Sequence, residues 1–411
     1  MTNPLFLQYH SLTSYPGTLL NRDDAGFAKT LPFGNAKRTR VSSQCLKYHW
    51  RNYEGKNSLR DVADMSVRSR KTFRQKIAEP IVESGHPKNT TAGVTYALSQ
   101  MVLNGETTKK EVQDNAEEAL EADDPLSVTD LDRIIVLGEA EVDYIRSVAS
   151  DALEELEQEE YDPESIAQTR DAIYRVLKDK DLQDNLRALG NAMGLDAAMF
   201  GRMVTSDILA QGDAAVHVAH AITTHEQQSE NDYFTAVDEL QDEGTGGTES
   251  GAALIQSKEL TSGLFYNYVV VDVPLLVSNL EGSATDDWKY ADLELTEEVL
   301  RRFTKMLGTV SPGAKLSSTA PYARSEFLMV ESGAEQPRTL ANAFKEAVEG
   351  DDLLERSVEK LSGYVSKVDQ MYGQHEERAA ATIAEADVPA EIASIDEIAD
   401  QWIPSQLPST S

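Results

Sequence analysis

The order of strand and helix signals limits the fold more than any other feature of this sequence. Strand-like segments are expected at 4–13, 215–224, 264–273 and 326–331, and helices at 42–53 and 296–310. If two polar stretches, 60–190 and 225–262, are set aside, the order becomes strand, helix, strand, strand, helix, strand. That order is typical of the ferredoxin-like fold, which RNA-recognition-motif proteins share. The sequence therefore predicts an α+β protein with a large helical insertion and a second, protruding excursion.

Three further segments complete this prediction. Residues 14–41 are expected to form a loop, and 338–350 a helix that ends at a glycine. One more helix is expected around IDEIADQWI, residues 395–403, ahead of a frayed tail.

The net charge of −32 is distributed unevenly along the chain. Residues 1–76 hold 14 lysines and arginines against 5 acidic residues, whereas the remainder holds 24 against 65. A basic segment on a strongly acidic body indicates an anionic partner such as nucleic acid. The alternative is an acidic surface suited to a salty habitat, with an incidental basic segment.

Basic side chains are concentrated between residues 20 and 51. Phosphate binding uses such donors together with hydroxyl groups and the free N–H groups of a helix N-terminus. The alternative is a solvated basic loop followed by an ordinary helix cap. The basic residues of the segment are Arg22, Lys29, Lys37, Arg38, Arg40, Lys47 and Arg51.

The helix predicted at 42–53 has two different faces. Ser42 or Ser43 is expected to cap its N-terminus. The apolar face, expected to join the core, consists of Leu46, Trp50 and Tyr53. The polar face, offered to an anion, consists of Gln44, Lys47 and Arg51.

Other reactive residues carry weaker signals. His217, His220 and His225 invite a metal site, but a strand would point His217 and His220 to opposite faces, so no metal or cofactor is expected. The single cysteine, Cys45, excludes an internal disulfide and is expected to be packed rather than nucleophilic.

Nothing in the sequence indicates a membrane partner. No apolar run approaches the roughly 20 residues that cross a bilayer, and residues 1–10 lack the basic start of a secretion signal. A soluble, cytoplasmic protein is expected.

Five segments, in order, resemble CasC-type backbone subunits of type I-E CRISPR Cascade, which belong to the RAMP superfamily. The first is LNRDD…K…FG…KR.R.SSQ.LK…R, residues 20–51. The others are GRMVTSD (201–207), AHAITTHEQQSENDYFTAVDEL (219–240), SG.FY (262–266), and PGAK with LANAFKEAV (312–315 and 340–348). The resemblance spans nearly the whole chain, although 60–190 matches poorly and is longer and more acidic than the family pattern.

The resemblance implies a hand-shaped molecule whose palm is the ferredoxin-like core. The implied limits are palm at 1–59, 191–224 and 263–373, helical acidic fingers at 60–190, a thumb at 225–262, and a C-terminal helix with a frayed tail at 374–411. Copies would polymerise along the CRISPR guide RNA (crRNA), kink it periodically and present it for pairing with target DNA. The implied partners are other copies of the chain, the other Cascade subunits and a recruited helicase-nuclease.

The resemblance also implies a role for particular residues. Met203 matches the position beside a displaced nucleotide, and Phe234 and Thr235 match the part of the thumb that displaces bases. Without the resemblance, core packing would be the favoured interpretation of Met203. The expected RNA-binding residues are Arg22, Lys29, Lys37, Arg38, Arg40, Ser42, Ser43, Gln44, Lys47, Arg51, Arg202 and Met203.

Catalysis is not expected of this chain. A sequence-tolerant endoribonuclease on the same fold, using the acidic pair Asp23 and Asp24, is the alternative. A monomeric RNA-binding protein of the RNA-recognition-motif type is a second alternative, and binding of a basic partner by the acidic insertion is a third.

Overall fold

The strand segments from the two ends of the chain come together in one sheet. The computed structural model describes residues 5–104, 123–158, 193–202, 212–236, 254–314 and 316–408. Contacts divide the chain into two units. The first unit contains Met1–Leu59, His217–Pro274 and Leu293–Ser411, and the second contains Arg60–Val216 and Leu275–Asp292.

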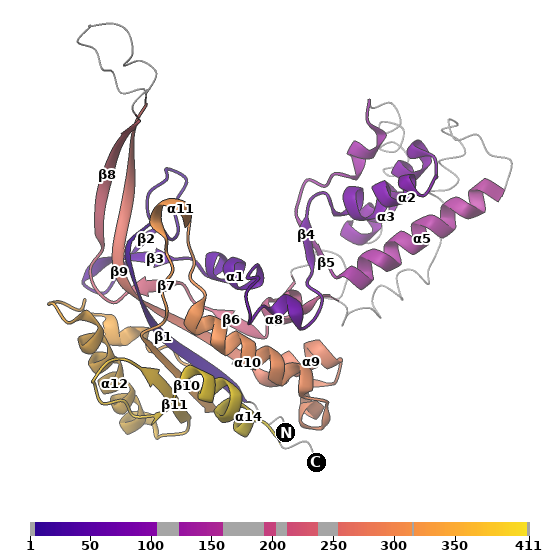
Figure 1. The fold of residues 1–411 in the computed structure, drawn as a ribbon. Helices are drawn as coiled ribbons and strands as arrows, with labels where there is room; N and C mark the ends of the chain where they lie inside the picture. Colours follow the sequence, from indigo (N-terminus) through magenta and orange to yellow (C-terminus); the bar gives the residue numbers. More distant parts are fainter. Residues whose placement is uncertain are drawn as a thin grey trace, which may run out of the picture. The chain divides into compact units, whose positions relative to one another are not determined.

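The centre of the sheet confirms the predicted fold class. Its four central strands lie in the order β10 (Phe327–Gly333), β1 (Phe6–Thr18), β9 (Leu254–Asp272), β7 (Ala221–Thr223), and all neighbours are antiparallel. Along the chain, α1 (Ser43–Arg51) follows β1, and α10 (Glu294–Thr309) connects β9 to β10 (Figure 1). This strand order and these two crossover helices are those of the ferredoxin-like fold.

The sheet is wider than predicted, because two strands are added at each end. At one end lie β3 (Ala36–Val41) and β2 (Thr30–Phe33), within the segment predicted as a loop. Gly34 makes their tight turn with φ of +62°, and an added Cβ would collide with the Lys345 carbonyl oxygen. At the other end lie β11 (Glu377–Thr382) and β12 (Glu391–Ile392).

The helix predicted at 338–350 is wrong apart from one 3-10 turn, η7 (Ala341–Phe344). The backbone N–H groups of this segment bond to other parts of the chain: Ala347 donates to Asn35 Oδ1 and Val348 donates to the Thr224 carbonyl. The long helix follows the segment instead, as α12 (Leu353–Tyr372). Tertiary contacts therefore outweigh the helical pattern of the sequence here.

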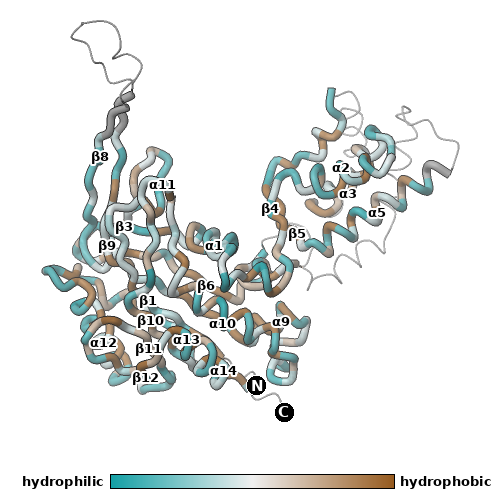
Figure 2. Tube along the Cα trace, in the orientation of Figure 1, coloured by the Kyte–Doolittle hydropathy of each residue, from teal (hydrophilic) through white to brown (hydrophobic). Residues whose placement is uncertain are grey.

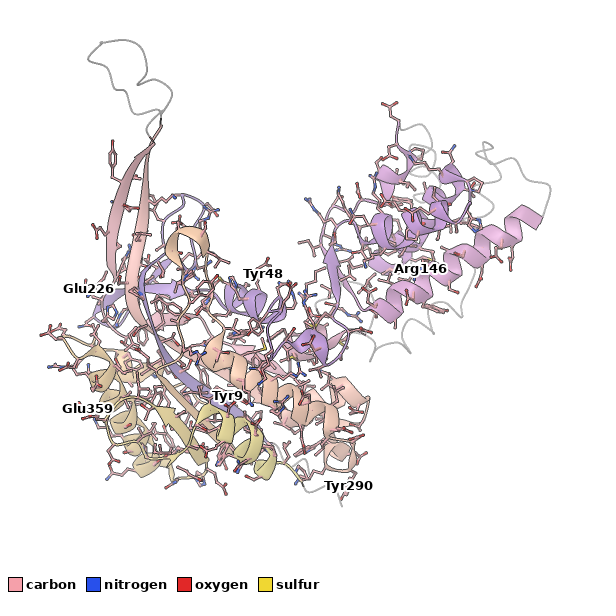
Figure 3. The ribbon with its side chains drawn as sticks, in the orientation of Figure 1. Tyr9, Tyr48, Arg146, Glu226, Tyr290 and Glu359 are labelled. Carbon is pink, nitrogen blue, oxygen red and sulfur yellow. The ribbon has the colours of Figure 1, made fainter. Side chains whose placement is uncertain are left out.

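The two faces of the sheet are covered by different helices. On one face Trp50 of α1 and Tyr9 of β1 meet Phe303 of α10, with ring centroids 5.4 and 6.3 Å from it. Figure 3 labels Tyr9 between β1 and α10. On the other face α12 and η7 pack against the sheet, and their core includes Leu12, Tyr266, Phe344 and Leu361. Both faces are buried, which fixes the strand register.

A cluster of charged side chains is buried on the α12 face. Glu331 Oε1 accepts a hydrogen bond from Arg378 Nε at 2.6 Å, and Glu331 Oε2 lies 3.1 Å from both His10 Nε2 and Arg338 NH1. Arg378 also binds Asp369 through two bonds of 2.6 and 2.7 Å. Burial raises the pKa of Glu331, but the His10 bond and the arginines outweigh it and lower that pKa to about 2.

A two-stranded arm projects from the sheet. It consists of β8 (Gln228–Ala236) and the first part of β9, paired from Gln228↔Ser262 to Ala236↔Leu254 (Figure 1). Figure 2 shows hydrophilic colouring along β8, whose residues 228–233 are exposed. The arm coincides with the excursion expected from the sequence.

The second unit is rich in helix, as the sequence predicts. Its core gathers Phe73 from the π-helix η2 (Phe73–Ala78), Leu98 from α3 (Lys88–Asn104), and Val142 and Ile145 from α5 (Glu139–Gln158). Residues 193–202 and 212–216 group with this unit, although the sequence placed 191–224 in the palm. Its elements are β4 (Val67–Ser69), the π-helix η2 (Phe73–Ala78), α2 (Glu79–Glu83), α3 (Lys88–Asn104), η3 (Pro125–Thr129), β5 (Ile135–Leu137), α5 (Glu139–Gln158), α8 (Leu195–Phe200) and η6 (Thr285–Tyr290).

The C-terminal helix predicted near 395–403 is present, and Ser394 and Glu397 form a capping box at its start. It comprises α13 (Ile395–Glu397), the π-helix η8 (Ile398–Trp402) and α14 (Ile403–Gln406). The other short elements are η1 (Leu59–Asp61), β6 (Val216–Val218), α9 (Val273–Glu281) and α11 (Leu316–Thr319). None of the helices in the described ranges has the length and apolarity needed to cross a membrane.

Candidate nucleic-acid interface

The loop between β1 and β2 is closed by its own backbone bonds. Asp23 N–H donates to the Phe27 carbonyl at 2.8 Å, and Lys29 N–H donates to the Asn21 carbonyl at 2.9 Å. Gly26 supplies the left-handed residue of the turn, with φ of +93°. Arg22 is exposed and Lys29 is partly exposed, so the loop presents both cations at the surface.

The loop is attached at two further points. Asn21 Oδ1 accepts a bond from Ser42 N–H at 3.0 Å, which joins the loop to the start of α1. Ala28 N–H donates to Glu259 Oε2 at 2.6 Å, which joins the loop to the base of the arm. The loop is therefore held in place between α1 and the arm.

The N-terminus of α1 is capped as predicted. Ser42 Oγ accepts a bond from Cys45 N–H at 3.3 Å. Ser43 N–H donates to His220 Nδ1 at 2.9 Å, so this imidazole nitrogen carries a lone pair. Desolvation, and then Arg40 and Lys29, lower the pKa of His220. Arg40 lies two residues before the N-cap Ser42 and its N–H donates to the Lys29 carbonyl at 2.8 Å, so both cations add to the positive potential of the helix N-terminus.

Within α1 the two faces are those expected from the spacing, but the helix ends at Arg51, so Tyr53 lies beyond it and is only partly buried. Leu46 and Trp50 are buried, whereas Gln44 is exposed and Lys47 and Arg51 are partly exposed. Between Asp24 and Glu54 the sequence contains no acidic residue, in a chain that has 70. Phosphate at Lys29, Lys47 or Arg51 would thus meet no carboxylate from residues 25–53, whereas Arg22 is followed directly by the exposed Asp23 and Asp24.

Arg38 corrects the expected set of RNA contacts. Its side chain is 0% exposed, and it donates to the carbonyls of Thr223 at 3.2 Å and Phe344 at 2.8 Å. Burial lowers its pKa. Arg38 therefore ties β3 to β7 and η7 from the inside, and it does not belong to the exposed basic surface.

Replacing Arg38 by methionine is expected to lower the free energy of unfolding by about 1–3 kcal/mol, because two buried carbonyls lose their charged donor. Its neighbour Lys37 is exposed and serves as the matched control. Lys37→Met is expected to change stability by less than about 0.5 kcal/mol. Thermal melts of both variants check this, and equal melting temperatures would contradict the internal role of Arg38.

Arg202 was also expected to bind RNA, but it does not belong to the exposed basic surface. Its side chain is 1% exposed, and its NH1 lies 2.6 Å from Glu141 Oε2, which is fully buried. Arg202 belongs to the second unit, where it joins the loop after α8 to α5. An ion pair enclosed in this way holds a unit together rather than contacting a ligand. Met203 lies outside the described residues.

The two thumb residues lie on β8. Phe234 is paired with Gln256 and Thr235 with Ile255, near the outer end of the described arm. The structure describes their backbone positions but not their side chains. Tyr233 beside them is 64% exposed, so the arm carries at least one exposed aromatic ring.

His225 and Cys45 serve internal contacts. His225 is buried, with Nε2 accepting a bond from Leu264 N–H at 3.1 Å and Nδ1 lying 2.7 Å from the Glu226 carbonyl. Burial raises the pKa of the Cys45 thiol, although Lys29 opposes this. Within the described ranges no group of three or more histidine, cysteine or acidic side chains is arranged to hold a metal ion.

The acidic pair of the loop has one local role. Asp23 Oδ1 accepts a bond from Phe27 N–H at 2.9 Å and so closes the turn. Asp24 is exposed.

The structure thus brings together most of the predicted surface residues. Arg22, Lys29, Arg40, Ser43, Gln44, Lys47 and Arg51 lie on the loop, the end of β3 and α1, and Lys37 lies farther along β3. Sequence reasoning missed Tyr48, which is 56% exposed on α1. Its spacing from Gln44 and Arg51 places it on the polar face and could have identified it.

The fold and this surface define a class of protein: a ferredoxin-like chain with a two-stranded arm, a helix-rich insertion and a basic loop-and-helix face. Many chains of solved structures share the fold, including two from CRISPR RNA-guided surveillance complexes. A chain of a structure described as a CRISPR RNA-guided surveillance complex, pre-nicking, matches with a TM-score of 0.74 at 24% identity, covering 98% of this chain and 100% of its own length. A chain of a CRISPR RNA-guided surveillance complex matches with a TM-score of 0.64 at 20% identity, covering 97% and 99%.

The family model described as CT1975-like protein matches residues 7–404, and the chain belongs to this family. No curated protein matches the sequence. The family model and the two solved chains each match nearly the whole of this chain, and the two solved chains share its fold.

Proposed function

We propose that this chain is a guide-RNA-binding backbone subunit of a type I-E Cascade, in which successive copies line the crRNA. The observation that carries the proposal is the basic face built by the loop and α1, which has no acidic residue between Asp24 and Glu54 in a chain of net charge −32. The family match and the shared fold with chains of CRISPR RNA-guided surveillance complexes support it.

The chemistry of this face fits phosphate and sugar rather than bases. Cations from Lys29, Lys47 and Arg51 attract phosphate, and such contacts carry no sequence information. The guide would then remain free to pair with target DNA, and pairing would supply the specificity. The arm would kink the guide at intervals and reach the neighbouring copy.

The proposal assigns no catalytic step to this chain. Cleavage would fall to a helicase-nuclease recruited to the assembled complex in the cytoplasm, and the other Cascade subunits would complete that complex. The alternative function is that of an endoribonuclease. It would be favoured if the purified chain cleaved guide RNA in the presence of magnesium and if Asp24→Ala abolished that cleavage.

Lys29→Ala and Lys47→Ala are expected to weaken binding of single-stranded RNA to a similar extent for every base sequence. Each lost phosphate contact should reduce the slope of log affinity against log salt by about 0.7. Fluorescence anisotropy with two RNAs of unrelated sequence, over a series of salt concentrations, measures both effects.

The control is Lys367→Ala, an exposed lysine on α12 across the sheet from α1, which should change neither affinity nor slope. A loss of affinity confined to one RNA sequence would contradict the backbone-contact assignment. Failure of the wild-type chain to bind RNA at low salt, alone and with its companion subunits, would contradict the proposed function itself.

A further inference from the structure

One aromatic ring lies among the cations of the proposed RNA-binding face. Tyr48 is on α1, between Lys47 and His49 in the sequence, and Figure 3 labels it on that helix. Its side chain is 56% exposed, whereas Leu46 and Trp50 of the same helix are 5% and 2% exposed. Tyr48 therefore does not belong to the core that holds α1 on the sheet.

The helical spacing places Tyr48 within the polar face. It follows Gln44 by four residues and precedes Arg51 by three, and residues at these spacings are neighbours on a helix surface. The face therefore reads as an amide, a lysine, an aromatic ring and an arginine over two turns.

Neighbouring side chains hold the Tyr48 ring in place. The guanidinium carbon of Arg51 lies 5.9 Å from the ring centroid, over the ring. The His49 ring lies edge-on, with centroids 5.4 Å apart and planes at 89°. His49 is fixed in turn, because its Nε2 accepts a bond from Gly313 N–H at 3.2 Å.

We propose that Tyr48 is a stacking platform for one unpaired base of a bound single-stranded RNA, beside the cations that hold its phosphates. This inference rests on the proposed function and adds a contact of a different physical kind. Stacking on an aromatic ring accepts any base, because every base has a π-face. The ring would therefore add affinity without adding sequence preference. A backbone subunit that must accept guides of any base sequence requires such contacts.

The substitution Tyr48→Ala is expected to weaken binding of single-stranded RNA about five- to hundredfold at every salt concentration. The slope of log affinity against log salt should stay at the wild-type value, because no phosphate contact is lost. Lys47→Ala on the same face should lower that slope, which separates the two kinds of contact. Tyr48→Phe keeps the ring and should bind like the wild-type chain.

An abasic RNA of the same length tests the contact directly. Without bases there is nothing to stack, so the wild-type chain and Tyr48→Ala should bind abasic RNA equally. The control is Tyr290→Ala, which removes a tyrosine that is 90% exposed in the second unit and should leave all affinities unchanged.

The outcomes separate this inference from the proposed function. Wild-type binding with no loss in Tyr48→Ala would overturn the stacking role and leave the RNA-binding proposal standing. A loss that persists on abasic RNA, or one accompanied by a lower salt slope, would also overturn it. Absence of RNA binding by the wild-type chain would overturn both.

Discussion

Replacing Arg378 by alanine is expected to lower the free energy of unfolding of the first unit by about 3–5 kcal/mol. The side chains of Arg378 and Glu331 are 2% and 0% exposed, so removal of the guanidinium takes the nearest cation from a buried carboxylate, which keeps only its longer bonds to His10 and Arg338. The substitution also removes both bonds to Asp369 and so separates β11 from α12. Chemical denaturation followed by tryptophan fluorescence measures the loss.

The readout can be limited to the first unit. Trp288 is the one tryptophan of the second unit, and Trp50 and Trp402 belong to the first, so a Trp288→Phe background reports the first unit alone. The matched control is Arg301→Ala, which breaks a one-third-exposed pair with Glu298 on α10 and should cost about 1 kcal/mol or less. Equal losses in the two variants would show that the buried cluster is not a special source of stability.

The same cluster gives the first unit a defined response to acid. The folded pKa of Glu331, about 2, lies below its ordinary value of 4.5. Glu331 therefore contributes its full stabilisation above about pH 4.5, and that contribution is lost as the pH falls toward 2. A Glu331→Gln variant should lose less stability than the wild-type chain over this pH range.

Shortening the arm is expected to abolish the length-dependent ladder of copies on guide RNA while sparing the fold. Residues 232–258 would be replaced by a four-residue Gly/Ser turn, which keeps Glu259 and its bond to Ala28. The described strand segments in this range pair only with each other, from Asp232↔Lys258 outward. Their removal therefore leaves the hydrogen bonds between the other strands of the sheet in place. Native gels with RNAs of increasing length count the copies bound.

Two measurements make the arm experiment decisive. The melting temperature of the shortened chain should stay close to that of the wild-type chain. Its affinity for an RNA long enough for one copy should also persist, because the basic loop and α1 are untouched. A normal ladder from the shortened chain would show that the arm does not serve assembly.

The core of the fold could be predicted because its signals are local. The segment 264–273 is rich in β-branched and aromatic residues, and 296–310 has helical periodicity. The strand β3 was not predicted, because Lys37, Arg38 and Arg40 give its segment the polar composition of a loop. Its pairing with β2 and β7 depends on contacts that no local pattern shows.

The candidate site was predictable to the same degree. The two faces of α1 follow from spacing alone, and the structure agrees with them as far as Arg51, where the helix ends before Tyr53. The burial of Arg38 does not follow from spacing, because its two acceptors lie 185 and 306 residues away in the sequence. A list of basic residues cannot separate a cation that holds segments together from one that faces solvent.

The strand β9 belongs to both the sheet and the arm. It runs for 19 residues, roughly 60 Å, without interruption. It pairs with β8 at its outer end and with β1 and β7 further along, and its pairing with β1 shifts register between Tyr15 and Thr18, where the arm begins. One strand therefore connects the outer end of the arm covalently and without a break to Tyr266 in the core of the sheet.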